Sequence, residues 1–305
     1  MKQRTTLFLG LAGAAVISVI ALFTPGCTCG SRGGPEPAKI DRVAYHGWAN
    51  AVRLTSAHAE VIVVPEIGRV MSFRLRDGEN VFWEDRSLDG KRGNTAGKEW
   101  VNFGGDKTWP APEAEWSKYT GRKQWMPPTG FDGLLCVVTI TNNEVVLTSP
   151  VDSHYGIRSI RNIRLWGSQL SINTTYERVS GEASKLGIWV ITQFKEPERI
   201  LVPMKPNSIF TNGYFKFGNE PWEQLQVNSN RIQIVRDPKM PHKMGSDTDR
   251  LIWMGEKEMC VVGSMRQSSG DYPDRGASAE VYTNPDPKKY VELELLGPLS
   301  ILKPG

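Results

Sequence analysis

The feature that most limits the fold is a long succession of short strand-like segments with no competing helical pattern. After residue 40, β-branched and aromatic runs alternate with Gly, Pro, Asn and Asp, and amphipathic helical periodicity over three turns is hard to find. Connecting turns of this kind predict an antiparallel all-β domain of two packed sheets. The predicted strands are 58–65, 68–76, 79–85, 133–143, 144–151, 157–166, 169–179, 186–194, 231–237, 249–255, 258–266, 277–283 and 289–297.

One long segment, residues 84–132, interrupts the strand pattern. It contains prolines, glycines and four tryptophans, at positions 100, 109, 116 and 125. Loops of this length without their own structure are uncommon in compact domains and are usually functional or disordered. The aromatic content argues against disorder. We therefore predict a folded excursion that lies over one face or edge of the sandwich.

The N-terminal region has the composition of an export signal. Lys2 and Arg4 precede the apolar run 7–23, and small residues follow it. The ending "TPGC" resembles a bacterial lipobox, which implies cleavage and lipidation of Cys27, although Thr24 and Pro25 depart from the usual pattern. A signal anchor that stays in the membrane, or simple secretion, are the alternatives.

These features divide the chain into three parts. Residues 1–26 form the signal peptide and residues 27–39 a tether rich in Gly, Pro and Ser. Residues 40–305 show no composition break, so we expect one domain. The expected location is the bacterial cell envelope, with the lipid anchor in the membrane.

Charge and cysteine content exclude several classes of partner. The net charge is +4 without a Lys/Arg block of five, so we expect no nucleic-acid partner and a monomer. No Cys/His spacing suggests zinc, and no cofactor or metal is expected. Cys136 and Cys260 lie in apolar runs, and either a disulfide or two free thiols is compatible with the sequence.

Several stretches resemble a known fold family. The segment "RLTSAHAEVIVVPEIGRVMSFRLRDGENVFWED" is similar to the opening strands of the galactose-mutarotase-like (aldose 1-epimerase-like) supersandwich, and "YPDRGASAEVYTNPDPKKYVELELLGPL" resembles its closing strands. "GGDKTWPAP" and "WMPPTGFDG" look like an uncharacterised bacterial family with that fold. The resemblance implies a carbohydrate site on a concave sheet face. In catalytic members a histidine acid and a glutamate base interconvert sugar anomers.

Two glutamates of the last long predicted strand are candidates for this site. Alternation places Glu292 and Glu294 on one face, separated by about 7 Å along the strand. The resemblance makes Glu294 the closer match to the catalytic glutamate. A solvent-facing polar strand is the alternative interpretation. The family histidine is missing, because Trp189 stands in that region, and His154 is the best substitute for the acid.

The excursion supplies further candidates in "GGDKTWPAP". The two glycines allow a tight turn or a close approach to a ligand. Asp106 and Lys107 offer an acceptor and a cationic donor, and Trp109 offers an apolar face to a sugar. A local ion pair is the alternative for the two charges. Trp189 is a second stacking candidate, and Arg158 is placed at the site for an acidic sugar.

Three functions follow from these residues. The first is an envelope lipoprotein that binds carbohydrate on the concave sheet face. The second is a mutarotase-like or epimerase-like isomerase, with Glu294 as base and His154 or a Lys/Asp pair as acid. The third is a noncatalytic structural lipoprotein, and fold alone does not decide among them.

Overall fold

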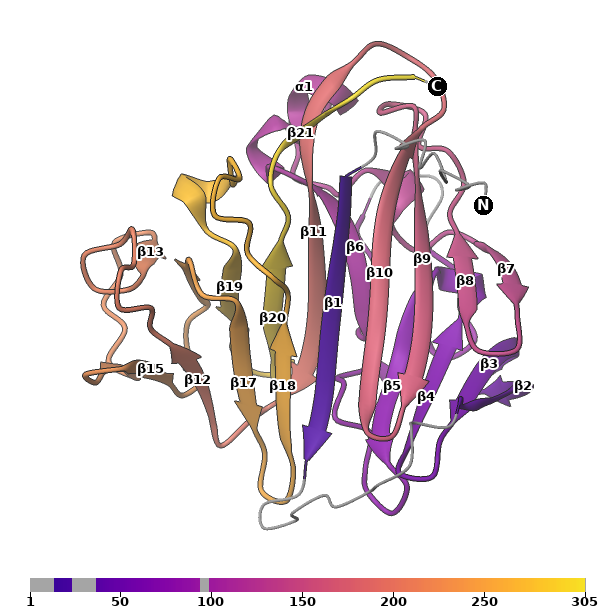
Figure 1. Ribbon diagram of the computed structural model, residues 1–305, viewed down its shortest axis with the longest axis horizontal. Helices are drawn as coiled ribbons and strands as arrows, with labels where there is room; N and C mark the ends of the chain where they lie inside the picture. Colours follow the sequence, from indigo (N-terminus) through magenta and orange to yellow (C-terminus); the bar gives the residue numbers. More distant parts are fainter. Residues whose placement is uncertain (1–13, 24–36, 94–98, 305) are drawn as a thin grey trace, which may run out of the picture.

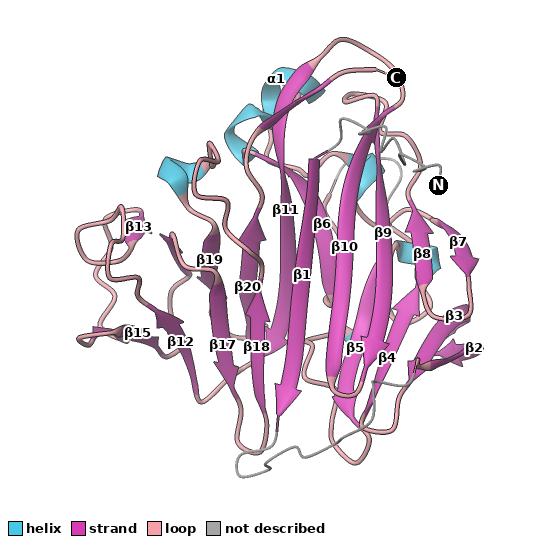
Figure 2. Ribbon diagram, in the orientation of Figure 1, coloured by secondary structure: helices cyan, strands magenta, loops and turns pink. Residues whose placement is uncertain are grey.

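The chain folds into two large antiparallel β-sheets that pack face to face (Figure 1). The structure is a computed structural model and describes residues 14–23, 37–93 and 99–304. Figure 2 shows how strongly strands predominate over helices. The prediction of an all-β domain of many antiparallel strands in packed sheets is confirmed.

We call the first layer sheet A. Its ten strands are ordered β14 (Leu225–Val227), β15 (Arg231–Ile234), β12 (Arg199–Pro203), β17 (Arg250–Met254), β18 (Met259–Gly263), β1 (Ala14–Phe23), β10 (Gln169–Arg178), β9 (Ile157–Trp166), β8 (Val145–Thr148) and β7 (Val137–Ile140).

We call the second layer sheet B. Its strands are ordered β13 (Phe215–Phe217), β16 (His242–Ser246), β19 (Ala279–Thr283), β20 (Tyr290–Leu296), β11 (Ser184–Lys195), β6 (Asp106–Ala111), β5 (Arg69–Leu75), β4 (Ala59–Val64), β3 (Trp48–Thr55) and β2 (Lys39–Tyr45), and β21 (Ser300–Leu302) also pairs with β11.

Within the described parts of the chain, helical structure is limited to short segments outside the sheets. The α-helix α1 lies at the upper end of the sandwich in Figure 2, close to the upper end of β11. The helical segments are η1 (Pro65–Ile67), η2 (Arg86–Leu88), η3 (Glu113–Glu115), α1 (Trp116–Thr120), η4 (Thr129–Phe131) and η5 (Asp274–Gly276).

The core lies between the two sheets, and a smaller one lies on the other face of sheet B. Alternation creates the main core, as in β9, where every second side chain from Ile157 is buried. The smaller cluster joins Trp48, Ile62 and Met71 to Phe103 of the excursion. The excursion therefore covers part of the outer face of sheet B, as predicted for a folded segment.

Most predicted strands are present, with two instructive differences. The predicted strand 157–166 coincides with β9. The predicted strand 79–85 is wrong, because this segment makes only isolated bridges at Phe82 and Glu84. The segment runs between β5 and β11, with the Val81 N–H donating to the Phe73 carbonyl and the Trp83 N–H to the Gln193 carbonyl, before it starts the excursion. The excursion in turn contains a strand, β6, that the sequence pattern did not predict.

The apolar run predicted as part of an export signal contributes strand β1. It pairs with β10 on one side and with β18 on the other, and Ile20 and Leu22 are buried in the main core. Cys27 and most of the tether lie outside the described residues, so cleavage and lipidation stay predictions. Among the described residues, no helix has the length and apolar content needed to span a membrane.

The two cysteines of the described domain are free thiols. Cys136 precedes β7 and is partly buried, whereas Cys260 lies in β18 and is fully buried. Burial raises the pKa of both thiols, that of Cys136 to about 11. Of the two alternatives that the sequence left open, the structure has the unpaired thiols.

Candidate functional site

The stretch "GGDKTWPAP" forms strand β6 in the middle of sheet B, although the sequence analysis treated it as a loop. Gly104 and Gly105 have φ values of +94° and +69°. A Cβ on Gly105 would lie 2.4 Å from the carbonyl oxygen of Val70, so only glycine fits this entry into the sheet.

Pro110 is tolerated in β6 because its backbone N and C=O point away from β11. Its carbonyl oxygen accepts a hydrogen bond from the Trp116 indole rather than from β11. The N and C=O of one residue point the same way in an antiparallel strand, so the missing N–H removes no bond to β11.

Alternation along β6 sends Asp106 and Lys107 to opposite faces of sheet B. Asp106 points into the main core, where it is fully buried and forms an ion pair with Arg161 of β9. It also accepts a hydrogen bond of 2.6 Å from the Thr192 hydroxyl. The prediction that Asp106 faces a ligand is therefore wrong, because a strand cannot present two successive side chains on one face.

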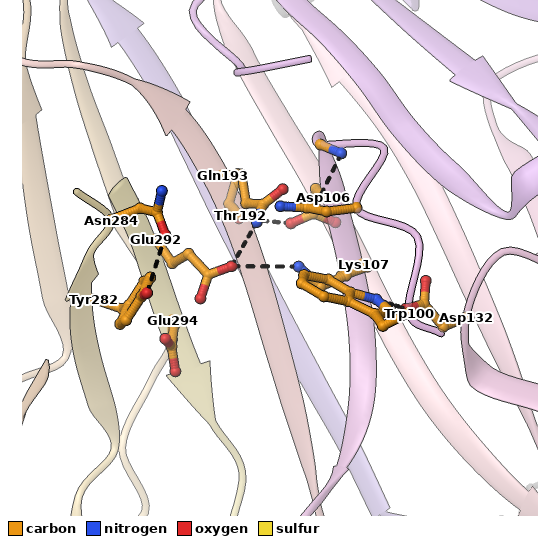
Figure 3. A network of polar contacts seen from close by, with 12 residues as sticks. Trp100, Asp106, Lys107, Asp132, Thr192, Gln193, Tyr282, Asn284, Glu292 and Glu294 are labelled. Carbon is orange, nitrogen blue, oxygen red and sulfur yellow. Dashed lines mark hydrogen bonds and ion pairs between the residues drawn. The ribbon is translucent and has the colours of Figure 1, made fainter. Parts of the chain in front are cut away.

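Lys107 lies on the outer face of sheet B and points toward Glu292 (Figure 3). Its Nζ is 3.5 Å from Oε1 of Glu292. The Lys243 Nζ from β16 lies 3.0 Å from Oε2 of Glu294 and 2.7 Å from Oε2 of Glu280. We call Glu280, Glu292 and Glu294 the carboxylate row. Strands β6, β16, β19 and β20 thus bring these five ionisable groups together.

Burial controls the ionisation of this face. It raises the pKa of Glu292 above its usual range, against the opposing effect of Lys107, and it raises that of Glu280. Burial also lowers the pKa of Lys107, which Glu292 only partly offsets. For Lys243 the balance is reversed: burial opposes its charge, but Glu294 and Glu280 raise its pKa, so it stays protonated. The Lys107–Glu292 pair is therefore the one closest to sharing a proton.

Exposure distinguishes the two glutamates named from the sequence. The Glu294 side chain is fully buried, and its Oε2 accepts a 2.7 Å hydrogen bond from the Trp189 indole. Glu292 keeps 13% of its side chain exposed, and Lys243 keeps 21%. The Gln193 amide donates to Glu292 Oε1 at 2.6 Å and fixes its position. Glu292, rather than Glu294, is the carboxylate that a ligand reaches first.

Some buried polar atoms of this face have no hydrogen-bond partner among the described residues. They are Nζ of Lys107, Nε1 of Trp109, Oε1 of Gln193 and Oε1 of Glu294. Buried polar groups are normally paired, because leaving one unsatisfied costs about 1–3 kcal/mol. These four atoms are left for a ligand or water to satisfy.

Five indoles form a tryptophan cluster beside the carboxylate row: Trp100, Trp109, Trp116, Trp125 and Trp189. Trp109 is central, and its ring centroid lies 5.4–6.1 Å from those of the other four, in edge-on contacts. Trp109 and Trp189 are 3% and 5% exposed. Both lie on the predicted face, but the excursion covers them, so neither is the open stacking surface that the sequence suggested.

Two predicted site residues do not lie on the outer face of sheet B. His154 is exposed in a turn before β9, where its backbone N–H donates to the Asp152 carboxylate. Arg158 is on the outer face of sheet A and pairs with Glu177 at 2.7 Å. The assignment of Arg158 to the site is wrong, because sheet A turns its other face, which carries Arg161, toward sheet B. The assignment of His154 is wrong because the residue is exposed in a turn that leads into sheet A rather than sheet B.

Sequence reasoning missed three residues of the site. Gln193 lies in the same predicted strand as Trp189 and, by alternation, on the same face. Glu280 lies in a predicted strand and is paired with Glu294. Pairing the predicted strands would therefore have identified both residues. Lys243 lies in "PHKMGS", which gave no strand signal. Among the described residues, no group of three or more His, Cys, Asp or Glu is arranged to hold a metal ion.

Comparisons with known proteins add structural neighbours only. No protein-family model matches the sequence, and no curated protein does. A provisionally named aldose 1-epimerase from Escherichia coli K12 is 12% identical with a TM-score of 0.47, over 88% of this chain and 95% of that one. A galactose mutarotase related enzyme from Lactobacillus acidophilus is 12% identical with a TM-score of 0.40, over 82% and 97% of the two chains. Likenesses at this level show nothing about the activity of this chain.

Proposed function

We propose that the chain binds carbohydrate on the outer face of sheet B. The observation that carries the proposal is the convergence of Lys107, Lys243 and the carboxylate row from four strands, beside a tryptophan cluster and with unsatisfied polar atoms. Sugar hydroxyl groups donate and accept hydrogen bonds, and their C–H faces pack on aromatic rings. The face offers both kinds of contact.

The accessible groups suggest how a sugar would be held. Glu292 supplies an acceptor and the Lys243 ammonium a donor. The Tyr282 hydroxyl, which donates its proton to Oδ1 of Asn284 at 3.1 Å, supplies a further acceptor. Glu294 and Glu280 fix the position of Lys243 through their ion pairs with its ammonium group. A small number of well-positioned polar groups of this kind is typical of small-molecule sites.

A sugar isomerase of the mutarotase or epimerase type is the second candidate, and the Lys107–Glu292 pair favours it. The two groups are 3.5 Å apart with pKa values shifted toward each other, which is the arrangement of an acid–base pair. In this version Glu292 is the base, because Glu294 is enclosed by Trp189 and Lys243. His154 has no part in it.

We further propose that the protein is a lipoprotein of the bacterial cell envelope, lipidated at Cys27. The basic start, the apolar run and the Gly-Cys ending support this proposal. A noncatalytic structural envelope protein is what remains if the face binds no sugar.

The test is sugar binding by the full chain and by two matched variants. Calorimetry with glucose, galactose, mannose and N-acetylglucosamine should detect binding that Glu292→Gln weakens at least tenfold, since a charged hydrogen-bond acceptor is lost. Glu177→Gln is the control, because Glu177 is a half-exposed glutamate paired with Arg158 on sheet A. If neither the unmodified chain nor Glu177→Gln binds any of these sugars, the proposal is refuted.

Anomer exchange followed by NMR separates the two candidates. Exchange that is faster than in buffer and is lost in Glu292→Gln supports the isomerase. Binding without faster exchange supports the binding protein.

A further inference from the structure

Trp125 is the exposed member of the tryptophan cluster, and it is held in place. Its side chain is 48% exposed. Its indole Nε1 donates to Oε1 of Glu113 at 2.7 Å, and its ring packs edge-on against Trp100 with centroids 5.5 Å apart at 86°. A large aromatic ring that is both fixed and open loses little entropy when it binds a partner.

Short contacts connect Trp125 to the site of the proposed function. Lys107 Nζ, 3.5 Å from Glu292, lies 4.7 Å from the centroid of the Trp109 ring. The Trp109 centroid is in turn 6.1 Å from that of Trp125. The open ring therefore lies within the length of a short oligosaccharide from the accessible carboxylate.

The charges of the face limit the kind of sugar. The carboxylate row has three acidic groups, whereas Lys107 and Lys243 are the two lysines beside it, and both already face its glutamates. No lysine of this group is free to pair with an acidic sugar. A neutral chain fits the polar groups without leaving a charge unpaired.

We infer that Trp125 is a second sugar subsite and that the ligand is a neutral oligosaccharide rather than a free monosaccharide. This inference rests on the proposed function and goes beyond it by assigning the ligand a length and a direction. One sugar unit lies at Glu292, and the chain extends over the excursion to the Trp125 ring.

The test measures affinity against chain length. Glucose, galactose, mannose and N-acetylglucosamine, and homopolymers of each with two to five units, are titrated against the full chain and against Trp125→Ala. Affinity should rise from one to about three units in the unmodified chain. Trp125→Ala should remove about a tenfold share of the oligomer affinity, as expected for loss of an aromatic anchor, and lower monosaccharide affinity by a much smaller factor.

Two further variants make the result specific. Trp125→Tyr keeps an aromatic face and should retain most of the length dependence. Val137→Ala removes an exposed apolar side chain, 69% exposed, from the edge strand of sheet A and should change nothing. Because Trp125 is half exposed, its replacement should leave the Tm nearly unchanged.

The outcomes separate this inference from the proposed function. Monosaccharide binding with no length dependence, or with equal loss for all lengths in Trp125→Ala, overturns the inference and leaves the proposed function standing. No binding of any sugar by the full chain overturns both.

Discussion

Adjacent residues of β6 should affect different properties of the protein, because alternation puts Asp106 in the core and Lys107 on the outer face. Asp106→Ala leaves the Arg161 guanidinium, 2% exposed, without its carboxylate partner. Breaking a buried ion pair in this way costs about 3–5 kcal/mol of unfolding free energy. One kcal/mol corresponds to about 2–4 °C in Tm for a domain of 150–250 residues, so we expect the Tm to fall by about 10 °C.

Urea unfolding and sugar titration of the same samples provide the assay. Asp106→Ala should lower the free energy of unfolding and leave sugar affinity, measured well below its Tm, close to that of the unmodified chain. Lys107→Met should weaken sugar binding, because it removes a charge from the binding face. It should lower the free energy of unfolding less than Asp106→Ala does, because its partner Glu292 keeps 13% of its side chain exposed.

A double-mutant cycle tests the cause of the stability loss. In Asp106→Ala/Arg161→Met neither charge is left alone, so the double variant should lose less stability than the sum of the two single variants, with a coupling of about 0.5–3 kcal/mol. A variant Asp106→Ala with unchanged Tm and weakened sugar binding would refute the reasoning, since it would place Asp106 on the ligand face.

Three further predictions concern the glycine entry, the thiol and the N-terminus. Gly105→Ala should destabilise the fold by more than Gly121→Ala, because both have φ near +70° but only the Cβ at Gly105 would meet the Val70 carbonyl; equal losses in urea unfolding would contradict this. The pKa of Cys136 rises from 9.0 to about 11 on folding, so the folded state keeps the thiol proton longer and stability should fall as the pH rises from 9 to 11. The loss of unfolding free energy is at most about 2.7 kcal/mol. Urea unfolding at each pH measures it, and the loss should be absent in Cys136→Ala. Mass spectrometry of the protein purified from membranes should show a lipidated N-terminal Cys27, and an intact N-terminus would rule out lipobox processing.

The parts of the fold that were predictable are those with clear alternation. Strand β9 was predicted to the residue because polar and apolar side chains alternate along its whole length. The face shared by Glu292 and Glu294 followed from the same period of two. Local pattern was sufficient wherever one face of a strand is buried and the other is not.

The parts that were missed depend on contacts between distant segments. Strand β6 follows two glycines and contains Pro110, and its pairing with β11 and β5 makes it a strand. The sequence analysis placed Arg158 rather than Arg161 at the site. Which of the two arginines is buried depends on which face of β9 turns toward sheet B, and the pattern of a single strand does not reveal that. Lys243 reaches the site through pairing of β16 with β19, which no local signal in its segment indicates.

The position of β1 has a consequence for the order of events during synthesis. Ile20 pairs with Leu170 and with Val262, so both neighbours of β1 emerge from the ribosome long after it. Pairings so distant in sequence form late, and until then residues 14–23 remain an unpaired apolar segment. The same segment is thus available to a targeting machinery throughout translation. If it is cleaved before folding, sheet A has to close with β10 and β18 brought together, or keep two unpaired edges at its centre.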